Sequence, residues 1–373
     1  PNVGKSSLFN ALARKSQAQA ENYPFCTIEP NIAQIALPDP YLEDLGKLAK
    51  SSRTIPASME FVDVAGLVKG ASKGEGLGNQ FLANIRECDA ILHLLRNYED
   101  NSVIHVAGGG KINPVEDAET VNAELMLADI AHIERRLEKS NCQSEERDAL
   151  ELLLPKLRDE GIPARSCGLS NSAQFAIKSM GLLTLKPVLY AFNVSRQAFL
   201  FEREKALEHA AEAVSKIRYS DPSRDLMTLV SAKMEARLSL LPIEKELDQL
   251  HKHGVDPSMD KYIEEEMSYV ALPLLIQKLL GLGTIYTGPG VHSSRSATTK
   301  SYVFKLAFPP TAGQFAGRLH GDIQKGFIKA EVLPATTLLK YESFHAARDA
   351  GLVKTEGKDH LLENHDVIEV KFK

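Results

Sequence analysis

The sequence has no apolar stretch long enough to cross a lipid bilayer. Its longest apolar runs, such as Val188–Phe192, fall far short of the roughly 20 residues that a membrane-spanning helix needs. Hydrophobic residues make up 43% of the chain and charged residues 25%, which is ordinary for a water-soluble globular protein. We therefore expect no contact with the membrane interior.

Cysteine is scarce, and the four residues of this type are far apart in the sequence. None of them forms a C-x-x-C pair, which argues against a zinc site and against a disulfide framework. Free thiols in a reducing compartment are the simplest interpretation, so we expect a cytoplasmic protein. The cysteines are Cys26, Cys88, Cys142 and Cys167.

Neither sign of charge dominates. The 44 basic and 49 acidic residues give a net charge of -5, so the molecule as a whole does not attract nucleic acid, and any RNA contact needs a local basic patch. The 373 residues exceed the size at which one hydrophobic core usually stops growing. Two or three domains are therefore expected.

The chain opens with PNVGKSSLFN, which contains the second half of a phosphate-binding loop of the pattern G-x-x-x-x-G-K-[ST]. This half is matched by Gly4, Lys5 and Ser6, and the first glycine of the pattern would lie before Pro1. We therefore expect the native chain to start upstream of Pro1, and a targeting peptide there remains an open alternative. In such a loop, backbone N–H groups bind phosphates, the lysine reaches the terminal phosphates and the hydroxyl binds Mg²⁺. The predicted nucleotide-binding residues of this segment are Asn2, Val3, Gly4, Lys5, Ser6 and Ser7.

Buried strands alternate with helical segments through much of the sequence. Apolar spacing predicts a helix directly after Lys5, and strands are predicted over residues 59–67, 89–95, 185–193 and 226–233. This alternation is typical of an α/β fold with a doubly wound, largely parallel sheet. Ligands of such sheets bind at the carboxyl ends of the strands.

Between residues 114 and 186 the pattern changes to two long amphipathic helices. Met126, Ile130, Ile133 and Leu137 form one apolar stripe, and a second helix starts at Ser144. The apolar side of the second helix carries Leu150, Leu153, Leu154 and Leu157, and Pro155 is expected to kink it. We expect an inserted helical hairpin; a packing arm without chemistry is the alternative.

A small α+β module is predicted at the C-terminal end. The glycine-rich run GLGTIYTGPG near Gly281 is expected to form turns. Strands are then predicted over residues 302–308, 327–333 and 365–373, with short helices near 314–323 and 344–350.

Polar residues that follow the predicted strands complete a nucleotide site. Asp63 and Gly66 form a D-x-x-G motif at the end of one strand, where the carboxylate can hold Mg²⁺ and the glycine N–H can contact the γ-phosphate. Thr27, between the loop and this strand, is a candidate third metal-binding residue beside Ser6 and Asp63. The base is expected between the ends of two further strands, at Asn193, Val194, Ser231, Ala232 and Lys233.

These motifs together resemble the YchF-type Obg-like ATPases, a family within the translation-factor class of P-loop proteins. The resemblance rests on PNVGKSSLFNAL, NYPFCTIEPN, DVAGLVKGASKGEGLGNQFLANIRECDAI and GFIKAEV, and it covers nearly the whole chain. It implies a GTPase-like domain in two parts (1–113 and 187–284), an inserted coiled-coil-like hairpin (114–186) and a ubiquitin-like TGS domain (285–373).

The residues near the base favour ATP over GTP. Guanine recognition uses N-K-x-D, in which the acid accepts hydrogen bonds from the guanine edge, whereas this chain has NVSR. Val194 replaces the lysine, and Arg196, which has only donors, replaces the acid. The resembling family has Glu at the position of Arg196, so this residue departs from the pattern of that family and from that of GTPases. An Obg-like GTPase therefore remains an alternative function.

The sequence leaves open how the attacking water is positioned. Leu67 stands where Ras-type enzymes have glutamine, and leucine cannot form a hydrogen bond. Family resemblance makes His105 a catalytic candidate beside Lys5, although a loop histidine is more often structural. A second candidate is a K⁺ ion near Asn2, and a third is a group supplied by a partner. Slow turnover is expected, and a regulatory nucleotide-binding module with incidental turnover is the alternative.

The resemblance also implies binding to the ribosome or ribosomal RNA through the TGS and helical domains. Basic side chains of the C-terminal module could form an RNA-binding face, but interleaved acidic residues equally suit a mixed solvated surface. The basic residues are Lys300, Lys305, Arg318, Lys325, Lys329 and Lys340.

Overall fold

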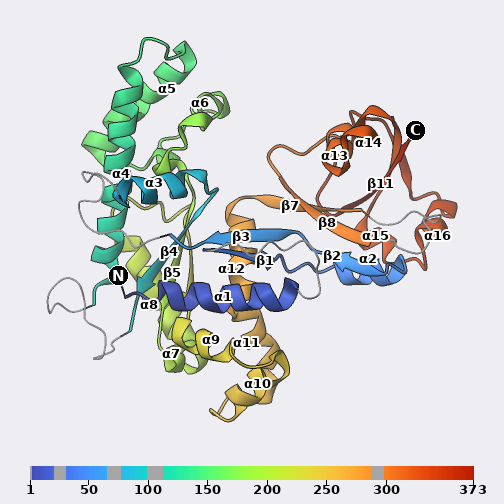
Figure 1. The fold of residues 1–373 in the computed structure, drawn as a ribbon, viewed down its shortest axis with the longest axis horizontal. Coiled ribbons are helices and arrows are strands. Elements are labelled where there is room, and N and C mark those ends of the chain that lie inside the picture. The colour runs from blue at the N-terminus through green and yellow to red at the C-terminus, as the bar shows by residue number, and fades with distance from the viewer. Residues whose placement is uncertain (1, 21–30, 65–76, 99–111, 288–297) are drawn as a thin grey trace. The chain divides into compact units, whose positions relative to one another are not determined.

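The computed structural model describes residues 2–20, 31–64, 77–98, 112–287 and 298–373 (Figure 1). The chain divides into two compact units. Unit 1 contains Pro1–Gln17, Ile28–Ala33 and Phe61–Leu279. Unit 2 contains Ala18–Thr27, Gln34–Glu60 and Leu280–Lys373.

Unit 1 is built around a parallel three-stranded sheet with the order β4-β5-β6. The strands are β4 (Ile91–Arg96), β5 (Val188–Asn193) and β6 (Leu226–Val230). All six residues of β5 are buried, as expected for a central strand of a parallel sheet covered on both faces. The predicted strands are present, but β5 begins at Val188 and not at Leu185, which ends a 3-10 helix. β6 ends at Val230 and not at Lys233, because the chain turns into a helix there.

Helices cover this sheet. α4 contacts β4, α8 contacts β6, and α12 contacts β5 and β6. The longer helices of unit 1 are α1 (Lys5–Ala20), α3 (Leu77–Glu87), α4 (Pro114–Leu137), α5 (Ser144–Pro155), α8 (Arg203–Lys216) and α12 (Ser268–Leu279). The shorter ones are α6 (Asn171–Ala176), α7 (Arg196–Phe201), α9 (Ala232–Leu238), α10 (Ile243–His251) and α11 (Asp260–Glu266).

Two further strands, β1 (Ile32–Ala36) and β3 (Ser58–Val62), pair with each other. The backbone N–H of Asp63 donates to the carbonyl of Asn31 at 2.8 Å, so the pairing extends one residue past the end of β3. The strand predicted over 59–67 is therefore present but ends at Val62, and Asp63 directly follows it.

The predicted helical hairpin is present as α4 and α5, which pack against each other. Met126 and Ile133 of α4 share a buried core with Leu150 and Leu153 of α5, as the apolar stripes predicted. Pro155 ends the α-helix, and a π-helical segment, Lys156–Glu160, follows it. The proline has no N–H with which to continue the regular pattern, so the helix changes form at this point.

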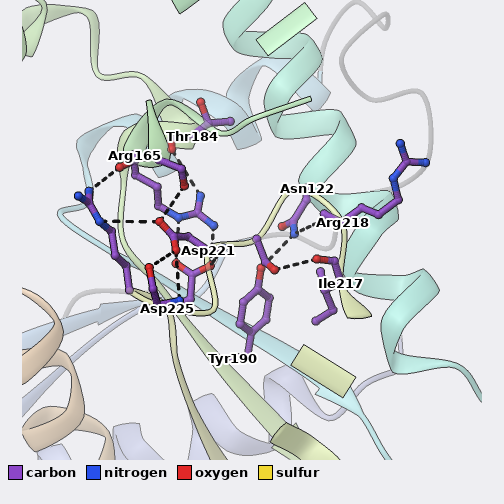
Figure 2. A network of polar contacts seen from close by, with 12 residues as sticks. Asn122, Arg165, Thr184, Tyr190, Ile217, Arg218, Asp221 and Asp225 are labelled. Carbon is purple, nitrogen blue, oxygen red and sulfur yellow. Dashed lines mark hydrogen bonds and ion pairs between the residues drawn. The ribbon is translucent and has the colours of Figure 1, made fainter. Parts of the chain in front are cut away.

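A buried ion pair lies at the base of the hairpin (Figure 2). Arg165 donates two hydrogen bonds to Asp225, from Nε to Oδ1 at 2.9 Å and from the guanidinium to Oδ2 at 2.7 Å. The Asp225 side chain is 0% exposed and that of Arg165 is 8% exposed. The Asp225 carboxylate also accepts from the Asp221 N–H at 2.8 Å, which satisfies a further oxygen lone pair.

Two other contacts attach α4 to the core of unit 1. The Asn122 amide of α4 donates to the Tyr190 hydroxyl of β5 at 3.0 Å (Figure 2). The buried Asp129 carboxylate accepts from the N–H of Leu183 at 3.0 Å and from the N–H of Thr184 at 2.7 Å. These buried polar contacts hold α4 against β5 and against the 3-10 helix Leu183–Leu185, because each partner would otherwise be left unsatisfied.

Unit 2 is an α+β module with a six-stranded mixed sheet of order β10-β9-β11-β7-β8-β2. Its strands are β2 (Arg53–Ile55), β7 (Leu282–Thr287), β8 (Thr298–Lys305), β9 (Phe327–Pro334), β10 (Lys354–Glu356) and β11 (Asp366–Phe372). Its helices are α2 (Leu42–Leu48), α13 (Ala312–Leu319), α14 (Gly321–Lys325), α15 (Ala335–Leu338) and α16 (Phe344–Asp349).

The predicted strands and helices of the C-terminal module are present, although the strand predicted over 302–308 runs from Thr298 to Lys305. One local prediction is wrong. Leu282–Thr287 form β7, which lies between β11 and β8, whereas the glycine-rich sequence around it predicted turns. Ile285 and Tyr286 are fully buried in the core of unit 2, and this tertiary packing overrides the local glycine signal. Throughout the described ranges, the structure contains no helix with the length and apolarity needed to cross a membrane.

Candidate functional site

The turn before α1 is held against the end of β5. Asn2 has a φ of 61° and Gly4 a φ of 96°, both in the left-handed region that favours glycine. A Cβ atom on Gly4 would lie 2.3 Å from Nδ2 of Asn193 and 3.3 Å from the Cβ of Ala232. Only glycine fits here without a shift of its neighbours, as the loop motif predicts.

Asn193, the last residue of β5, connects three segments of the site. Its Nδ2 donates to the carbonyl of Val3 at 2.8 Å, and its Oδ1 accepts from the N–H of Ala232 at 3.0 Å. The side chain is buried, with the residue 1% exposed. The loop before α1 and the start of α9 are thus tied to the same amide.

Lys5 and Asp63 form an ion pair at the start of α1. Lys5 is the first residue of α1 and Asp63 is the residue after β3. The Asp63 side chain is 16% exposed and that of Lys5 37% exposed, so both charged groups of the pair are partly accessible to solvent. The structure therefore brings together the two residues to which the sequence assigned the γ-phosphate and the metal.

Ser6 and Ser7 follow in the first turn of α1, and both are exposed. The first turn of a helix presents N–H groups that lack intrahelical partners, together with the positive end of the helix dipole. Hydroxyl and carboxylate oxygens are the ligands that Mg²⁺ prefers, and Ser6 and Asp63 supply one of each. This part of the site suits a phosphate group with a divalent cation.

A neighbouring part of the site is formed by the start of α9. Ser231 is 1% exposed, its Oγ donates to the Val194 carbonyl at 3.2 Å, and the Val194 N–H donates to the Val230 carbonyl at 2.9 Å. Ala232 and Lys233 lie in the first turn of α9. The five residues predicted to surround the base therefore lie at the neighbouring ends of β5 and β6.

Glu235 supports this side of the site and was missed by sequence reasoning. It is 3% exposed, and its carboxylate accepts from the Ser231 N–H at 3.3 Å, from the Ser268 N–H at 2.9 Å and from the Ser268 Oγ at 2.7 Å. Burial raises the pKa of this carboxyl above its ordinary value. The sequence signal that could have identified Glu235 is an acidic residue in the first turn of a helix that begins directly after a serine.

A pocket of about 580 Å³ opens beside these residues, a size typical of small-molecule sites. Its apolar wall includes Val194, Met234 and Leu238, and Asn193 and Ser231 lie along the same pocket. Its further lining residues are Tyr98, Ser195, Arg196, Lys233, Arg237, Leu241, Gln249, Leu250 and His253.

Three of the predicted site residues lie outside the described part of the chain: Thr27, Gly66 and His105. Leu67 also lies there. Their predicted roles in metal binding, phosphate sensing and catalysis therefore stay predictions.

Two family models match the chain. A family described as 50S ribosome-binding GTPase matches residues 1–123, and a family of unknown function named for the C-terminal part of YchF GTPases matches residues 300–373. The first match contains the loop before α1 and Asp63. The second lies within unit 2.

Curated relatives extend the similarity to the whole chain. The ribosome-binding ATPase YchF of Escherichia coli O157:H7 is 39% identical, and that of Bacillus subtilis is 37% identical; both alignments cover 100% of this chain and 97% of the relative. Obg-like ATPase 1 of Pongo abelii is 34% identical, with 100% and 90% covered.

The fold is also similar to that of a solved structure. The structure of the YchF GTPase of Schizosaccharomyces pombe superposes with a TM-score of 0.80 at 29% identity, covering 100% of this chain and 95% of the other. With this agreement in fold and the curated relatives of more than 30% identity over the full length, the chain belongs to the YchF family.

Proposed function

We propose that this protein is a Mg²⁺-dependent P-loop nucleotide hydrolase that prefers ATP to GTP, turns over slowly, and acts as a switch that binds ribosomes or the translation machinery. The observation that carries the proposal is the meeting of Lys5 and Asp63 at the first turn of α1. Lys5 would supply the cation that contacts the γ-phosphate, and Asp63 would supply the carboxylate that binds the metal.

The chain's own groups would divide the work on the triphosphate. N–H groups of Gly4, Lys5, Ser6 and Ser7 would bind phosphate oxygens, and the Lys5 ammonium would neutralise charge that develops on the terminal phosphate. Asp63 pairs with Lys5 and so keeps the ammonium at the start of α1. Positioning and charge stabilisation are the main contributions a protein makes to phosphoryl transfer.

P-loop hydrolases generally use Mg²⁺, and the residues present fit this ion. Ser6 and Asp63, with Thr27 as a further proposed ligand, would hold it through oxygen atoms. When bound, the cation would offset charge on the β- and γ-phosphate oxygens. We also propose a K⁺ ion near Asn2 as a second, monovalent cofactor.

The base would lie in the pocket between Asn193, Val194 and the segment Ser231, Ala232 and Lys233. Arg196 lines this pocket at the position where a guanine-specific site has an acid. Because Arg196 cannot accept a hydrogen bond, the guanine clamp cannot form, and this supports ATP as the substrate.

Leu67 cannot orient the attacking water, so another group must do so. His105, the proposed K⁺ ion and a group supplied by a partner are the three candidates. Slow intrinsic turnover is consistent with each of them. Leu67 also favours the second candidate function, a regulatory module in which nucleotide is a ligand and hydrolysis is incidental.

The proposal extends to domains and partners. The nucleotide-binding domain would comprise residues 1–113 and 187–284, the hairpin 114–186 and the TGS domain 285–373. Relatives are named ribosome-binding ATPases, which supports a ribosomal partner and a cytoplasmic location. We further propose that the hairpin and the TGS domain contact this partner. The basic residues proposed for an RNA-binding face are Lys300, Lys305, Arg318, Lys325, Lys329 and Lys340.

The experiment is a measurement of phosphate release from ATP and from GTP, with and without ribosomes, in K⁺ and in Na⁺. The protein should release phosphate faster from ATP, and Lys5→Ala should lose most of this activity, whereas Lys216→Ala, an exposed lysine on α8, should keep it. Equal rates for the protein and Lys5→Ala would refute the enzyme assignment. No acceleration under any condition would favour the binding module.

A further inference from the structure

The loop that carries Arg196 is held in place on both sides. The Val194 N–H donates to the Val230 carbonyl at 2.9 Å, and the Ser195 Oγ accepts from the Ala198 N–H at 3.2 Å, capping α7. Arg196 is the first residue of α7 and follows Asn193 by three positions. Its backbone is therefore fixed at the edge of the pocket, and Arg196 is exposed there as one of the residues that line it.

The charged groups of this pocket all have one sign. Among the described residues that line it, Arg196, Lys233 and Arg237 are basic, and no aspartate or glutamate is present. At position 1 of the Watson–Crick edge, guanine has an N–H donor and adenine has an acceptor, whereas at position 6 guanine has an acceptor and adenine a donor. An arginine at position 1 would therefore face a donor in guanine but could pair with N1 of adenine.

We propose that Arg196 is a specificity-determining residue that donates a hydrogen bond to N1 of adenine and rejects guanine by placing donor against donor. The inference rests on the proposed nucleotide function and adds to it the atom of the base that Arg196 contacts. Selection of this kind combines an attractive contact for one ligand with a repulsive one for its competitor.

A purely electrostatic role for Arg196 makes a different prediction. A cation that only attracts the triphosphate would strengthen binding of every nucleotide by the same factor, so its removal would leave the ratio of affinities unchanged. Arg237, which lines the same pocket from α9, is the matched control for this effect. The ratio between two nucleotides, and not the affinity for either one, is therefore the informative quantity.

The test is calorimetric titration of ATP, GTP and 1-deaza-ATP, in the presence of Mg²⁺, into the full-length protein. 1-deaza-ATP keeps the shape and the amine of adenine but lacks the N1 acceptor. The variants are Arg196→Ala, Arg196→Asp and Arg237→Ala, with Lys216→Ala as an exposed control outside the site. Arg196→Asp restores the acid that guanine recognition uses.

The protein should bind 1-deaza-ATP about 10- to 100-fold more weakly than ATP, the usual value of one hydrogen bond to a charged group. Arg196→Ala should bind the two equally, and Arg196→Asp should shift preference towards GTP. Arg237→Ala should weaken all three nucleotides by one factor.

Equal affinity of the unaltered protein for ATP and 1-deaza-ATP would overturn the role of Arg196 while leaving the proposed hydrolase intact. The same holds if Arg196→Ala leaves the ratio of ATP to GTP affinity unchanged. Failure of the unaltered protein to bind any of the three nucleotides would overturn both proposals.

Discussion

The Nδ2 of Asn193 donates a hydrogen bond to the backbone carbonyl of Val3 at 2.8 Å, across 190 positions of the sequence. The same side chain accepts from the Ala232 N–H at 3.0 Å. One buried amide thus joins the loop proposed to bind phosphate with the two segments proposed to surround the base. A nucleotide bound here would contact segments that are already fixed relative to each other.

Asn193→Ala should therefore reduce both stability and nucleotide affinity. The substitution leaves the Val3 carbonyl and the Ala232 N–H without their partner, and each unsatisfied buried group costs about 1–3 kcal/mol. Chemical denaturation should show a loss of about 2–4 kcal/mol. Asn171→Ala, an exposed asparagine on α6, is the control and should change little. A variant with unaltered stability and ATP affinity would contradict this account of Asn193.

Gly4→Ala should abolish tight nucleotide binding. The new Cβ would lie 2.3 Å from Asn193 Nδ2, so either the loop or the asparagine must move. Gly168→Ala is the matched control, because Gly168 also has a positive φ, 66°, but nothing within 4 Å of its added Cβ. Both variants should incur the backbone cost of about 1–2 kcal/mol, and only Gly4→Ala should lose ATP affinity in calorimetric titration. Equal losses of affinity in the two would show that the contact with Asn193 is unimportant.

The sequence predicted the parts of the fold that carry strong local signals. The stripe of Met126, Ile130, Ile133 and Leu137 predicted α4, because helical periodicity over many residues has few alternative interpretations. The strands before Asp63 and Asn193 were predicted because they are short and apolar and are followed by polar motif residues. The position of Asn193 follows from the rule that ligands bind at the carboxyl ends of parallel strands, because β5 is the central strand of the parallel sheet. Asp63 follows β3, which pairs with β1 in a separate sheet of the described structure, and its contact with Lys5 was not predictable from that rule.

Other elements depend on contacts that local patterns do not contain. β7 was predicted as a turn because of its flanking glycines, yet Tyr286 and Ile285 are fully buried. β2 is three residues long and is stabilised by pairing with β8, more than 200 positions away in the sequence. Glu235 was missed because its importance comes from Ser268, a residue on a different helix.

Breaking the buried ion pair at the base of the hairpin should be strongly destabilising. Asp225→Ala leaves the buried Arg165 guanidinium without its carboxylate, which costs about 3–5 kcal/mol for a pair of this kind. Glu212→Ala breaks the exposed pair with Lys216 on α8 and should leave stability almost unchanged, because solvent screens such a pair. Urea denaturation measures both. A similar small cost for the two variants would show that the Asp225 pair contributes no more than a surface pair.

Stability should fall as the pH is lowered from about 6.5 to 4, in part because of His93. Burial lowers the pKa of His93 from 6.5 to about 4, so the folded protein holds this imidazole neutral while the unfolded chain protonates it. The contribution is present above pH 6.5 and is lost as the pH approaches 4, up to about 3 kcal/mol. His93→Gln should flatten the stability profile over this range, measured by denaturation at several pH values. An unchanged slope would mean that His93 is protonated equally in both states.

The central claim is that the start of α1, with Lys5 and Asp63, binds the triphosphate of a nucleotide together with Mg²⁺. Titration of a nonhydrolysable ATP analogue with Mg²⁺ into the protein and into Lys5→Ala tests it most directly, since it measures binding without turnover. We predict saturable binding of one analogue per chain, weakened at least about tenfold in Lys5→Ala, as expected for loss of one charge-assisted contact. Equal affinity of the two proteins, or no binding to either, would contradict the claim.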